Sequence, residues 1–417
     1  MSDVAPLSAA VPKPEHIPGS VIYDFDFFRD PAYLADPHKR ILELVRSAPP
    51  LFWTPRNGGP WMFLSHEANF KASRDPDTFS SQFVTEEQMK AFMAQLPPGM
   101  PRIPLAVPIN LDPPEHTKYR APLQKAFSPK TMLALKESIR ALANELIDKV
   151  IDRGRCDFMV DIAEPLPVQV FLKLLGLPLD RQAEYRAIVR AQLANTEHDA
   201  KKSMMNLIQV TAIMRDTILA RRDQPRDDML SMLWKSEIDG RPTTLEDMEN
   251  YAVLLFIAGL DTVMNGMGFG VRHLAQDPEL QRTLRADPRR IPVAAEELLR
   301  RYTFTVPVRQ VRKDVVFEGV PMREGERVML FLPAADLDPK EFPDADRLDI
   351  QREKPHIAFN AGPHRCLGSH LARVELQTLY EQMLERLPEF RLDPKHPPKF
   401  HGGPVIGVDS LTLVWNA

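Results

Sequence analysis

The sequence predicts a mainly α-helical protein with a smaller β-rich part, an α+β fold. Between residues 115 and 300 the chain has helical periodicity almost throughout, with capping residues at the ends of its segments. After residue 305, short apolar runs separated by Glu-Gly turns predict strands. No period of 20 to 50 residues repeats, which excludes a solenoid.

The N-terminal part begins with residues 1–20, which hold four prolines and predict an extended arm. We expect the remaining residues, 21–417, to form a single domain. Asp36 followed by Pro37 predicts a helix start, with the helix continuing to about residue 48. Two apolar runs flank Asn57-Gly58, which predicts a hairpin, and a short helix is expected over 65–75.

A proline-rich segment follows, with seven prolines between Leu96 and Pro114 and apolar residues among them. Two interpretations stay open. The segment is either a surface loop or a lid or wall over an apolar pocket.

Several helix boundaries are marked in the central part. Ser128-Pro129 predicts a helix start, Gly176-Leu177-Pro178 predicts a stop, and two helices are expected within 180–223 with a break near 195–199. The capping-box pattern of residues 243–246 opens a helix that we expect to reach Gln276.

The C-terminal part combines strands and one long helix. The strand-like runs are VRQV, VVF and VMLFL, and later VIGV and LTLVW. The helix is predicted over about 367–387.

The composition excludes several classes of protein. The net charge of −4 argues against a general nucleic-acid binder, which would be basic. Two cysteines exclude a disulfide scaffold and fit a reducing compartment. We find no long uncharged apolar run, no secretory signal and no glycine-rich phosphate loop, so we expect a cytoplasmic protein with no membrane contact.

The segment from Phe359 to Gly368 is the most informative. A loop containing Gly and Pro delivers Cys366 just before a helical pattern, whose positive end favours a thiolate. The residues alone leave four interpretations: an inert buried cysteine, a metal ligand, a nucleophile with His364 or His370 as base, or a zinc site using all three.

A second feature is the run of apolar or small residues 251–260, which ends in Asp261-Thr262. Such a run on one helix implies burial on all sides, and Ala258-Gly259 leaves room for something large beside it. Asp261 is then either satisfied by a partner arginine or part of a proton relay facing a ligand.

Two weaker patterns place charged residues on one helix face. Glu297 and Arg300 are three apart and can pair, and His116 and Arg120 are four apart and can hold an anion. Either pattern alone also fits an ordinary solvated helix face.

Together these four patterns, in this order, resemble the cytochrome P-450 superfamily of haem-thiolate monooxygenases over essentially the whole chain. The chain is similar to the bacterial camphor-hydroxylase branch in residues 23–27, 111–115 and 296–301 and in the closing LVW. The resemblance implies the cytochrome P-450 fold, with haem b between the long central helix and the Cys366 loop with the last long helix.

The resemblance also implies roles for the residues around the haem. Cys366 would be the axial iron ligand, whose thiolate favours O–O cleavage. Glu297 and Arg300 would form a buried structural pair. The other implied cofactor-binding residues are Phe359 beside the sulfur, Gly362 and Gly368 where the backbone passes close to the porphyrin, Ala258 and Gly259 on the long helix, and His116, Arg120, Arg309 and His364 at the propionates.

On the oxygen-binding side, the resemblance implies that Thr262 hydrogen-bonds the bound oxygen and that Asp261 feeds the proton relay. Pro104 aligns where the camphor enzyme has a tyrosine that holds a ketone, so we expect a pocket without that polar anchor. The implied pocket residues are nearly all apolar: Leu105, Ala106, Val107, Leu254, Ile257, Ala258, Thr305, Val306, Val405 and Ile406.

We therefore expect a monooxygenase that hydroxylates or epoxidises a small apolar substrate, such as a terpenoid or a small aromatic, using O2. The resemblance implies that electrons come from a [2Fe-2S] ferredoxin fed by an NADH-dependent reductase. The ferredoxin would dock near the Cys366 loop, where Arg365 and Arg120 could meet an acidic partner. The resemblance also implies a monomeric enzyme. The alternative is a haem-thiolate ligand-binding or sensor protein without turnover. A third class, a Cys/His hydrolase or zinc protein, does not use the Phe359–Gly368 pattern as a unit.

Overall fold

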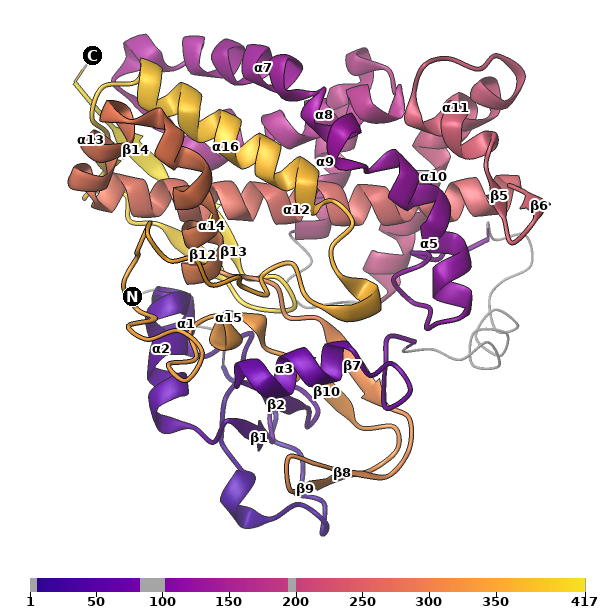
Figure 1. Ribbon diagram of the computed structural model, residues 1–417, viewed down its shortest axis with the longest axis vertical. Helices are drawn as coiled ribbons and strands as arrows, with labels where there is room; N and C mark the ends of the chain where they lie inside the picture. The colour runs from indigo at the N-terminus through magenta and orange to yellow at the C-terminus, as the bar shows by residue number, and fades with distance from the viewer. Residues whose placement is uncertain (1–5, 83–101, 194–199, 417) are drawn as a thin grey trace. The chain divides into compact units, whose positions relative to one another are not determined.

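The computed structural model describes residues 6–82, 102–193 and 200–416. Its chain forms two compact units, residues 1–80, 136–163 and 262–417, and residues 81–135 and 164–261. The helix α12 (Leu245–Gln276) contributes to both units (Figure 1). The single domain expected over 21–417 stays a prediction.

The first unit contains the β-rich part. Its main sheet has the strand order β1-β2-β10-β7-β3, and only the β2–β10 pair is parallel. These strands are β1 (Leu51–Trp53), β2 (Trp61–Phe63), β3 (Phe79–Ser80), β7 (Val308–Val311) and β10 (Arg327–Leu330). The predicted hairpin is confirmed as β1–β2, whose turn contains Asn57 and Gly58 at φ 55° and 79°.

Smaller β elements complete the strands of this unit. They are β4 (Arg155–Asp157), β8 (Val315–Phe317), β9 (Val320–Met322), β11 (Arg391–Leu392), β12 (Lys399–His401), β13 (Gly407–Ser410) and β14 (Thr412–Val414). Strands β11, β14 and β4 form one sheet, and β8–β9 and β12–β13 form two-stranded pairs.

The apolar core of the main sheet packs against α3 (His66–Ser73). Trp61, Phe63 and Phe79 are fully buried in the same cluster as Ala68 and Ala72 of the helix. The helix begins as predicted, because the Ser65 side chain accepts a hydrogen bond from the Ala68 N–H. This packing fixes the end of α3.

The helices of the first unit have these bounds: α1 (Pro31–Ala35), α2 (Pro37–Ser47), α7 (Lys136–Asp148), α13 (Pro278–Ala286), α14 (Ile291–Arg301), α15 (Leu332–Ala335) and α16 (Ser369–Arg386). Helix α16 packs against α7 and α14. It also approaches α12 closely, since a Cβ on Gly270 would lie 1.9 Å from the Tyr380 hydroxyl. Glycine is therefore required where the two helices cross.

The second unit is almost entirely helical. Besides the first half of α12 it contains α5 (Glu115–Ala126), α6 (Pro129–Leu133), α8 (Pro165–Leu175), α9 (Gln182–Leu193), α10 (Ala200–Asp223), α11 (Met229–Trp234) and the hairpin β5 (Glu237–Ile238) with β6 (Arg241–Pro242). Helix α10 packs against α9 and α11, and α8 packs against α9. The predicted stop at Gly176 and the two helices predicted within 180–223 are confirmed, whereas the predicted break at 195–199 lies outside the described residues.

The capping box of α12 lies one residue later than predicted. Thr244 and Asp247 form it, with the Asp247 N–H donating to the Thr244 hydroxyl and the Thr244 N–H donating to the Asp247 carboxylate. The Thr243 hydroxyl instead donates to the Ser236 carbonyl oxygen. Asp247 is also the partner of Arg241, so a contact outside the helix selects one of two overlapping boxes.

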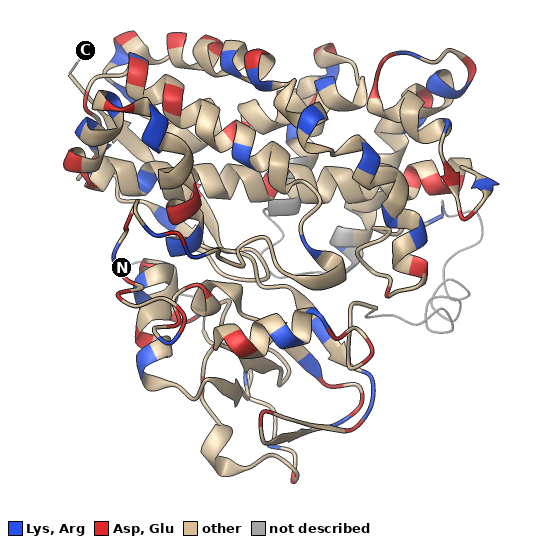
Figure 2. Ribbon diagram, in the orientation of Figure 1, with Lys and Arg blue, Asp and Glu red and all other residues tan. Residues whose placement is uncertain are grey.

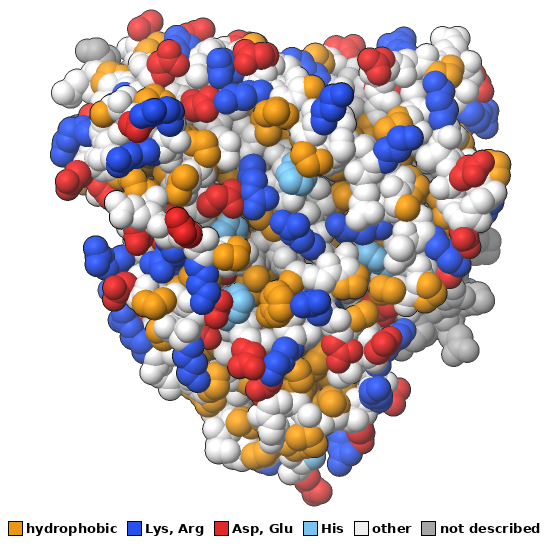
Figure 3. Space-filling model, in the orientation of Figure 1, with side chains coloured by type: hydrophobic (Ala, Val, Ile, Leu, Met, Phe, Trp, Pro, Cys, Tyr) orange, Lys and Arg blue, Asp and Glu red, His pale blue; other side chains and the backbone are white. Residues whose placement is uncertain are grey.

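Helix α12 is the one helix in the described part of the chain that is long and apolar enough to cross a membrane. Of its most apolar 18-residue window, 71% is buried inside the protein, as in a core helix. Its first turns, next to β5, gather acidic side chains (Figure 2). On the face shown in Figure 3, acidic and basic side chains are interleaved.

Candidate functional site

Residues 359–366, which we call the Cys366 loop, present an exposed thiol at the start of α16. The Cys366 N–H donates to the Phe359 carbonyl oxygen at 2.8 Å and closes the loop on itself. Cys366 is exposed and lies three residues before the first residue of α16. The positive end of an 18-residue helix therefore follows the sulfur directly in the chain, which favours a thiolate.

The Cys366 loop is anchored to the end of α3. The Ser73 hydroxyl donates to Asn360 Oδ1 at 2.6 Å, and the same oxygen accepts from the Ala361 N–H. Gly362 has a φ of 67°, and a Cβ on it would lie 2.2 Å from the Ser73 carbonyl oxygen. Only glycine fits here, so the loop shape depends on Gly362 and on the fixed position of α3.

Phe359 is held from one side by a cation. Arg373 of α16 lies 4.5 Å from the centre of the Phe359 ring and forms a bidentate ion pair with Glu296 at 2.6 and 2.8 Å. His356 also contacts Glu296, at 3.2 Å. Burial raises the pKa of Glu296, but hydrogen bonds from His356 and Arg373 outweigh it and lower the pKa to about 2.

This arrangement of Glu296, His356 and Arg373 was not predicted from the sequence. Its members lie up to 77 residues apart, and none of them stands at a spacing that distinguishes it from a surface charge. The one available signal was that Glu296 directly precedes Glu297 in the predicted pair.

Glu297 and Arg300 form a buried bidentate ion pair on α14. The two side chains are 4% and 1% exposed, and the N···O distances are 2.8 and 2.7 Å. Arg300 also donates to the carbonyl oxygens of Asp336 and Ala345, and Arg352 adds a second cation at 3.1 Å from Glu297. The pair ties α14 to the segment that leads to the Cys366 loop.

The residues expected on the oxygen-binding side lie together on α12. Ala258 is exposed, whereas Gly259, Asp261 and Thr262 are half-buried, and α12 is one continuous α-helix through all of them. Ala258 and Asp261 are three apart, and Ala258 and Thr262 four apart, so these side chains share one helix face. A Cβ on Gly259 would make an ordinary 3.5 Å contact with Phe171.

The basic residues expected at the propionates lie in both units. His116, 2% exposed, and Arg120 are four apart on α5 in the second unit. In the first unit, Arg309 is 5% exposed on β7, and His364 ends a short 3₁₀ turn in the Cys366 loop.

The residues of the Cys366 loop fit a haem. The loop offers one exposed sulfur, a soft ligand, and is closed by a glycine that no other residue could replace. Gly368, which follows, would have no atom within 4 Å of an added Cβ, so space is open beside it. In the first unit, Arg309 and His364 carry N–H groups of the kind that a carboxylate accepts from.

The structure gives no support to the zinc alternative. Within residues 6–82, 102–193 and 200–416, no three His, Cys, Asp or Glu side chains gather in a way that could hold a metal ion.

Four of the expected pocket residues lie on paired segments of the first unit. Thr305 and Val405 form an antiparallel bridge, and the Val306 and Ile406 N–H groups donate across the same pairing. Val306 and Ile406 are fully buried, whereas Thr305 and Val405 are half-buried. Of these four, Thr305 and Val405 are the ones whose side chains reach open space.

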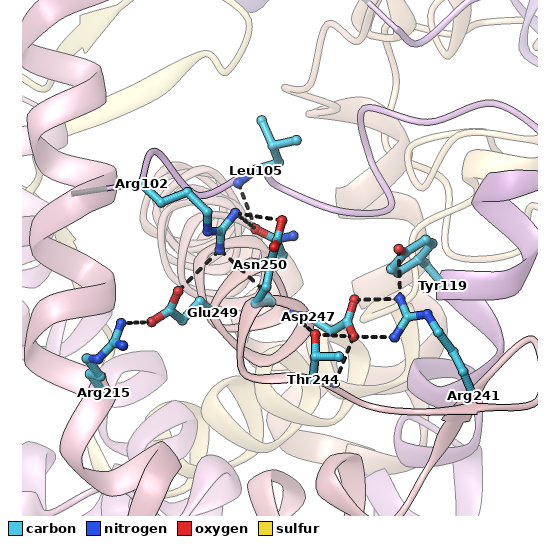
Figure 4. Close-up of polar contacts among 10 residues, drawn as sticks. Arg102, Leu105, Tyr119, Arg215, Arg241, Thr244, Asp247, Glu249 and Asn250 are labelled. Atoms are coloured by element: carbon cyan, nitrogen blue, oxygen red, sulfur yellow. Dashed lines mark hydrogen bonds and ion pairs between the residues drawn. The ribbon is translucent and has the colours of Figure 1, made fainter. Parts of the chain in front are cut away.

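The other expected pocket residues lie in the second unit, on α12 and on residues 105–107. Leu254 is 8% exposed and Ile257 is 38% exposed. The Leu105 N–H donates to Asn250 Oδ1 of α12 at 2.9 Å (Figure 4). Pro104 is buried and brings no polar group. Of the proline-rich segment, residues 83–101 lie outside the described residues, so the choice between loop and lid stays open.

Comparison with known sequences gives one family. The family model described as Cytochrome P450 matches residues 178–410. A probable cytochrome P450 127A1 from Sinorhizobium fredii is 35% identical over 415 residues, covering 97% of each chain. The steroid C26-monooxygenase of Mycolicibacterium smegmatis is 33% identical over 82% of this chain and 84% of its own. The mycinamicin IV hydroxylase/epoxidase of Micromonospora griseorubida is 35% identical over 74% of this chain and 79% of its own.

Comparison with solved structures agrees with the comparison of sequences. The crystal structure of CYP101J2 superposes with a TM-score of 0.86 at 32% identity, covering 98% of this chain and all of that one. The crystal structure of CYP101C1 has the same TM-score at 31% identity, covering 97% of this chain and all of that one. The predicted mainly α fold with a smaller β part is confirmed.

Proposed function

Because the chain belongs to the cytochrome P450 family, it is a haem-thiolate monooxygenase with haem b as its cofactor, and we propose that its substrate is a compact apolar molecule such as a terpenoid or a small aromatic. The reaction inserts one oxygen atom of O2 into a C–H bond or an alkene. The haem supplies the iron at which O2 is activated. The chain supplies the thiolate of Cys366, the propionate partners and the pocket walls.

The apolar lining of the second unit supports this substrate class. Leu105 is held by its backbone to α12, where Leu254 and the exposed Ile257 and Ala258 follow. With Pro104 beside them, these residues offer contact area and no side-chain hydrogen bond. Such a pocket selects a ligand by shape and apolar burial.

A spectral titration of the purified protein tests this proposal. The reduced protein under carbon monoxide should first show the Soret band of thiolate-ligated haem. Terpenoids and small aromatics should then displace the axial water and shift the oxidised Soret band. A cholesterol-type steroid serves as the large comparison ligand, because one relative is named a steroid C26-monooxygenase. A larger shift with the steroid than with every compact ligand would contradict the proposal.

We propose that the Thr262 hydroxyl would donate a hydrogen bond on the oxygen-binding side of the haem and that Asp261 would deliver protons there. In Thr262→Ala we expect NADH and O2 consumption to continue while peroxide rises and product per NADH falls by about tenfold, because proton delivery becomes unspecific. Thr262→Ser keeps the hydroxyl and should stay coupled. Product and peroxide yields measured against NADH give the result, and full coupling in the alanine variant would reject the role.

The same measurement separates the enzyme from the alternative, a ligand-binding or sensor protein without turnover. Product formation coupled to NADH consumption supports the enzyme. A haem spectrum and ligand shifts with no product, under any tested electron donor, would support the sensor.

We place the ferredoxin beside the Cys366 loop. A hollow of about 920 Å³ borders this loop in the first unit. Its lining includes the basic residues Lys71, Arg74 and Arg365, the acidic residues Glu67 and Glu341, and Phe70 as an exposed apolar contact. Basic and aromatic side chains of this kind suit a small acidic [2Fe-2S] protein. A monomeric, cytoplasmic enzyme that receives its electrons from a separate NADH-dependent reductase completes the proposal.

Charge reversal tests the docking site. Arg365→Glu should slow reduction by the ferredoxin by about tenfold at low salt, because charge complementarity sets the association rate. Reduction by dithionite should be unchanged. Arg289→Glu, whose side chain is 90% exposed away from the hollow, is the matched control. Equal reduction rates for the Arg365 variant and the wild type would place the docking site elsewhere.

A further inference from the structure

The first turns of α12 hold the segment 102–107, which carries three of the proposed pocket residues. Asn250 is 6% exposed, and its Oδ1 accepts from the Leu105 N–H at 2.9 Å and from Arg102 Nη1 at 3.1 Å (Figure 4). One side-chain oxygen therefore fixes both the backbone and the charged residue of this segment.

Arg102 makes three further contacts with α12. It donates to the Glu249 and Glu246 carboxylates at 3.2 and 3.3 Å and to the Glu246 carbonyl oxygen at 3.3 Å. Arg215 of α10 pairs with the same Glu249. The segment 102–107, α12 and α10 thus share one ion-pair network.

The relative exposure of these groups shows which contact matters most. The side chains of Arg102 and Arg215 are 31% and 51% exposed, and both line a hollow of about 540 Å³. Solvent screens these ion pairs at their arginine ends, although Glu249 is only 9% exposed. The bond between Asn250 and the Leu105 N–H carries no ion pair to be screened, and losing the acceptor would leave a backbone donor without its partner.

Helical geometry then connects Asn250 to the pocket. Residues 254, 257, 258 and 261 follow Asn250 at spacings of 4, 7, 8 and 11, which lie on one helix face. Asn250 therefore holds Leu105 at the beginning of the face that carries Ile257, Ala258 and Asp261. No other described hydrogen bond joins the Leu105 N–H to a side chain.

We infer that Asn250 is a positioning residue that sets the size of the substrate pocket by fixing the segment 102–107 against α12. The inference rests on the proposed function, because it takes residues 105–107 as a pocket wall. Asn250 itself contacts no substrate. Its loss should leave iron ligation intact and widen the range of positions that the wall adopts.

The first test measures the segment directly. In hydrogen–deuterium exchange followed by mass spectrometry, Asn250→Leu should speed exchange of the peptide containing Leu105, since its N–H loses the acceptor. Asn250→Asp keeps the accepting oxygen and should restore slow exchange. Arg241→Gln breaks a different ion pair at the same end of α12, with Asp247 and Tyr119, and should leave this peptide unchanged.

The second test measures the pocket with two nitrogen ligands of the haem iron, imidazole and 4-phenylimidazole. Only the larger ligand must fit against the pocket wall. We expect Asn250→Leu to lower the affinity for 4-phenylimidazole by about tenfold, the effect of one lost hydrogen bond, and to leave the affinity for imidazole unchanged. Asn250→Asp should bind both ligands with the affinity of the wild type. A general loss of stability caused by changing residue 250 would not allow that result.

The outcomes separate this inference from the proposed function. Unchanged exchange at Leu105 in Asn250→Leu, or equal weakening of both ligands, overturns the inference. A protein without haem overturns the proposed function, while the exchange experiment still reports on the contact itself. If Asn250→Leu does not fold, Asn250→Ala removes the same acceptor of the Leu105 N–H without added bulk. That variant should then show faster Leu105 exchange and a selective loss of 4-phenylimidazole, and a wild-type result would reject the inference.

Discussion

Cys366→Ser abolishes product formation and removes the Soret band of thiolate-ligated haem from the reduced, carbon monoxide-bound protein. The expected loss is complete within detection, because the proposed role of the thiolate is to ligate the iron and to favour O–O cleavage, and a serine hydroxyl stays protonated at neutral pH. The Cys366 loop itself should keep its shape. Its closing hydrogen bond joins the residue 366 N–H to the Phe359 carbonyl oxygen and does not involve the side chain.

The second cysteine provides the control. Cys156 is 4% exposed on β4, and burial together with the nearby Asp161 and Asp157 raises the pKa of its thiol to about 12. It is therefore an uncharged core side chain at neutral pH. Cys156→Ala should keep the spectrum and the activity. A thiolate-type spectrum that persists in Cys366→Ser and disappears in Cys156→Ala would reverse the assignment.

Local sequence signals predicted those parts of the molecule that local interactions determine. Asp36 caps α2 as expected, with its side chain accepting from the Lys39 N–H, and Gly176 ends α8 in the left-handed conformation. The Cys366 loop belongs to this group. Its glycine, its closing hydrogen bond and the start of the following helix lie within about ten residues, so the pattern could be recognised without the fold, whereas its anchor at Ser73 of α3 is 287 residues away from Asn360.

The remaining parts depend on residues that only the fold brings together. Arg373, which lies over Phe359, pairs with Glu296 across 77 residues, and Arg102 bonds to Asn250 across 148 residues. Each of these residues is an ordinary polar residue in its own segment. The shift of the α12 capping box to Asp247 has the same cause, since Arg241 of a neighbouring hairpin chooses between two adjacent acidic residues.

The buried pair Glu297–Arg300 should dominate the stability of the first unit. We expect Arg300→Met to lower the free energy of unfolding by about 3–5 kcal/mol, because it leaves the Glu297 carboxylate, 4% exposed, with only Arg352 as a cation. Urea denaturation of the haem-loaded protein, followed by circular dichroism and by the Soret band, measures the change. Lys149→Met removes an exposed pair with Glu145 and should cost less than about 0.5 kcal/mol.

The double variant Glu297→Met/Arg300→Met distinguishes two reasons for this loss. If the cost were only that of an unpaired charge, removing both partners would restore stability. Arg300 also donates to the carbonyl oxygens of Asp336, Ala345 and Arg347, and these would lose their donors in both variants. We therefore expect the double variant to recover only part of the loss. Full recovery would show that the charge pair alone matters, and a loss within about 0.5 kcal/mol for Arg300→Met would show that the pair is dispensable.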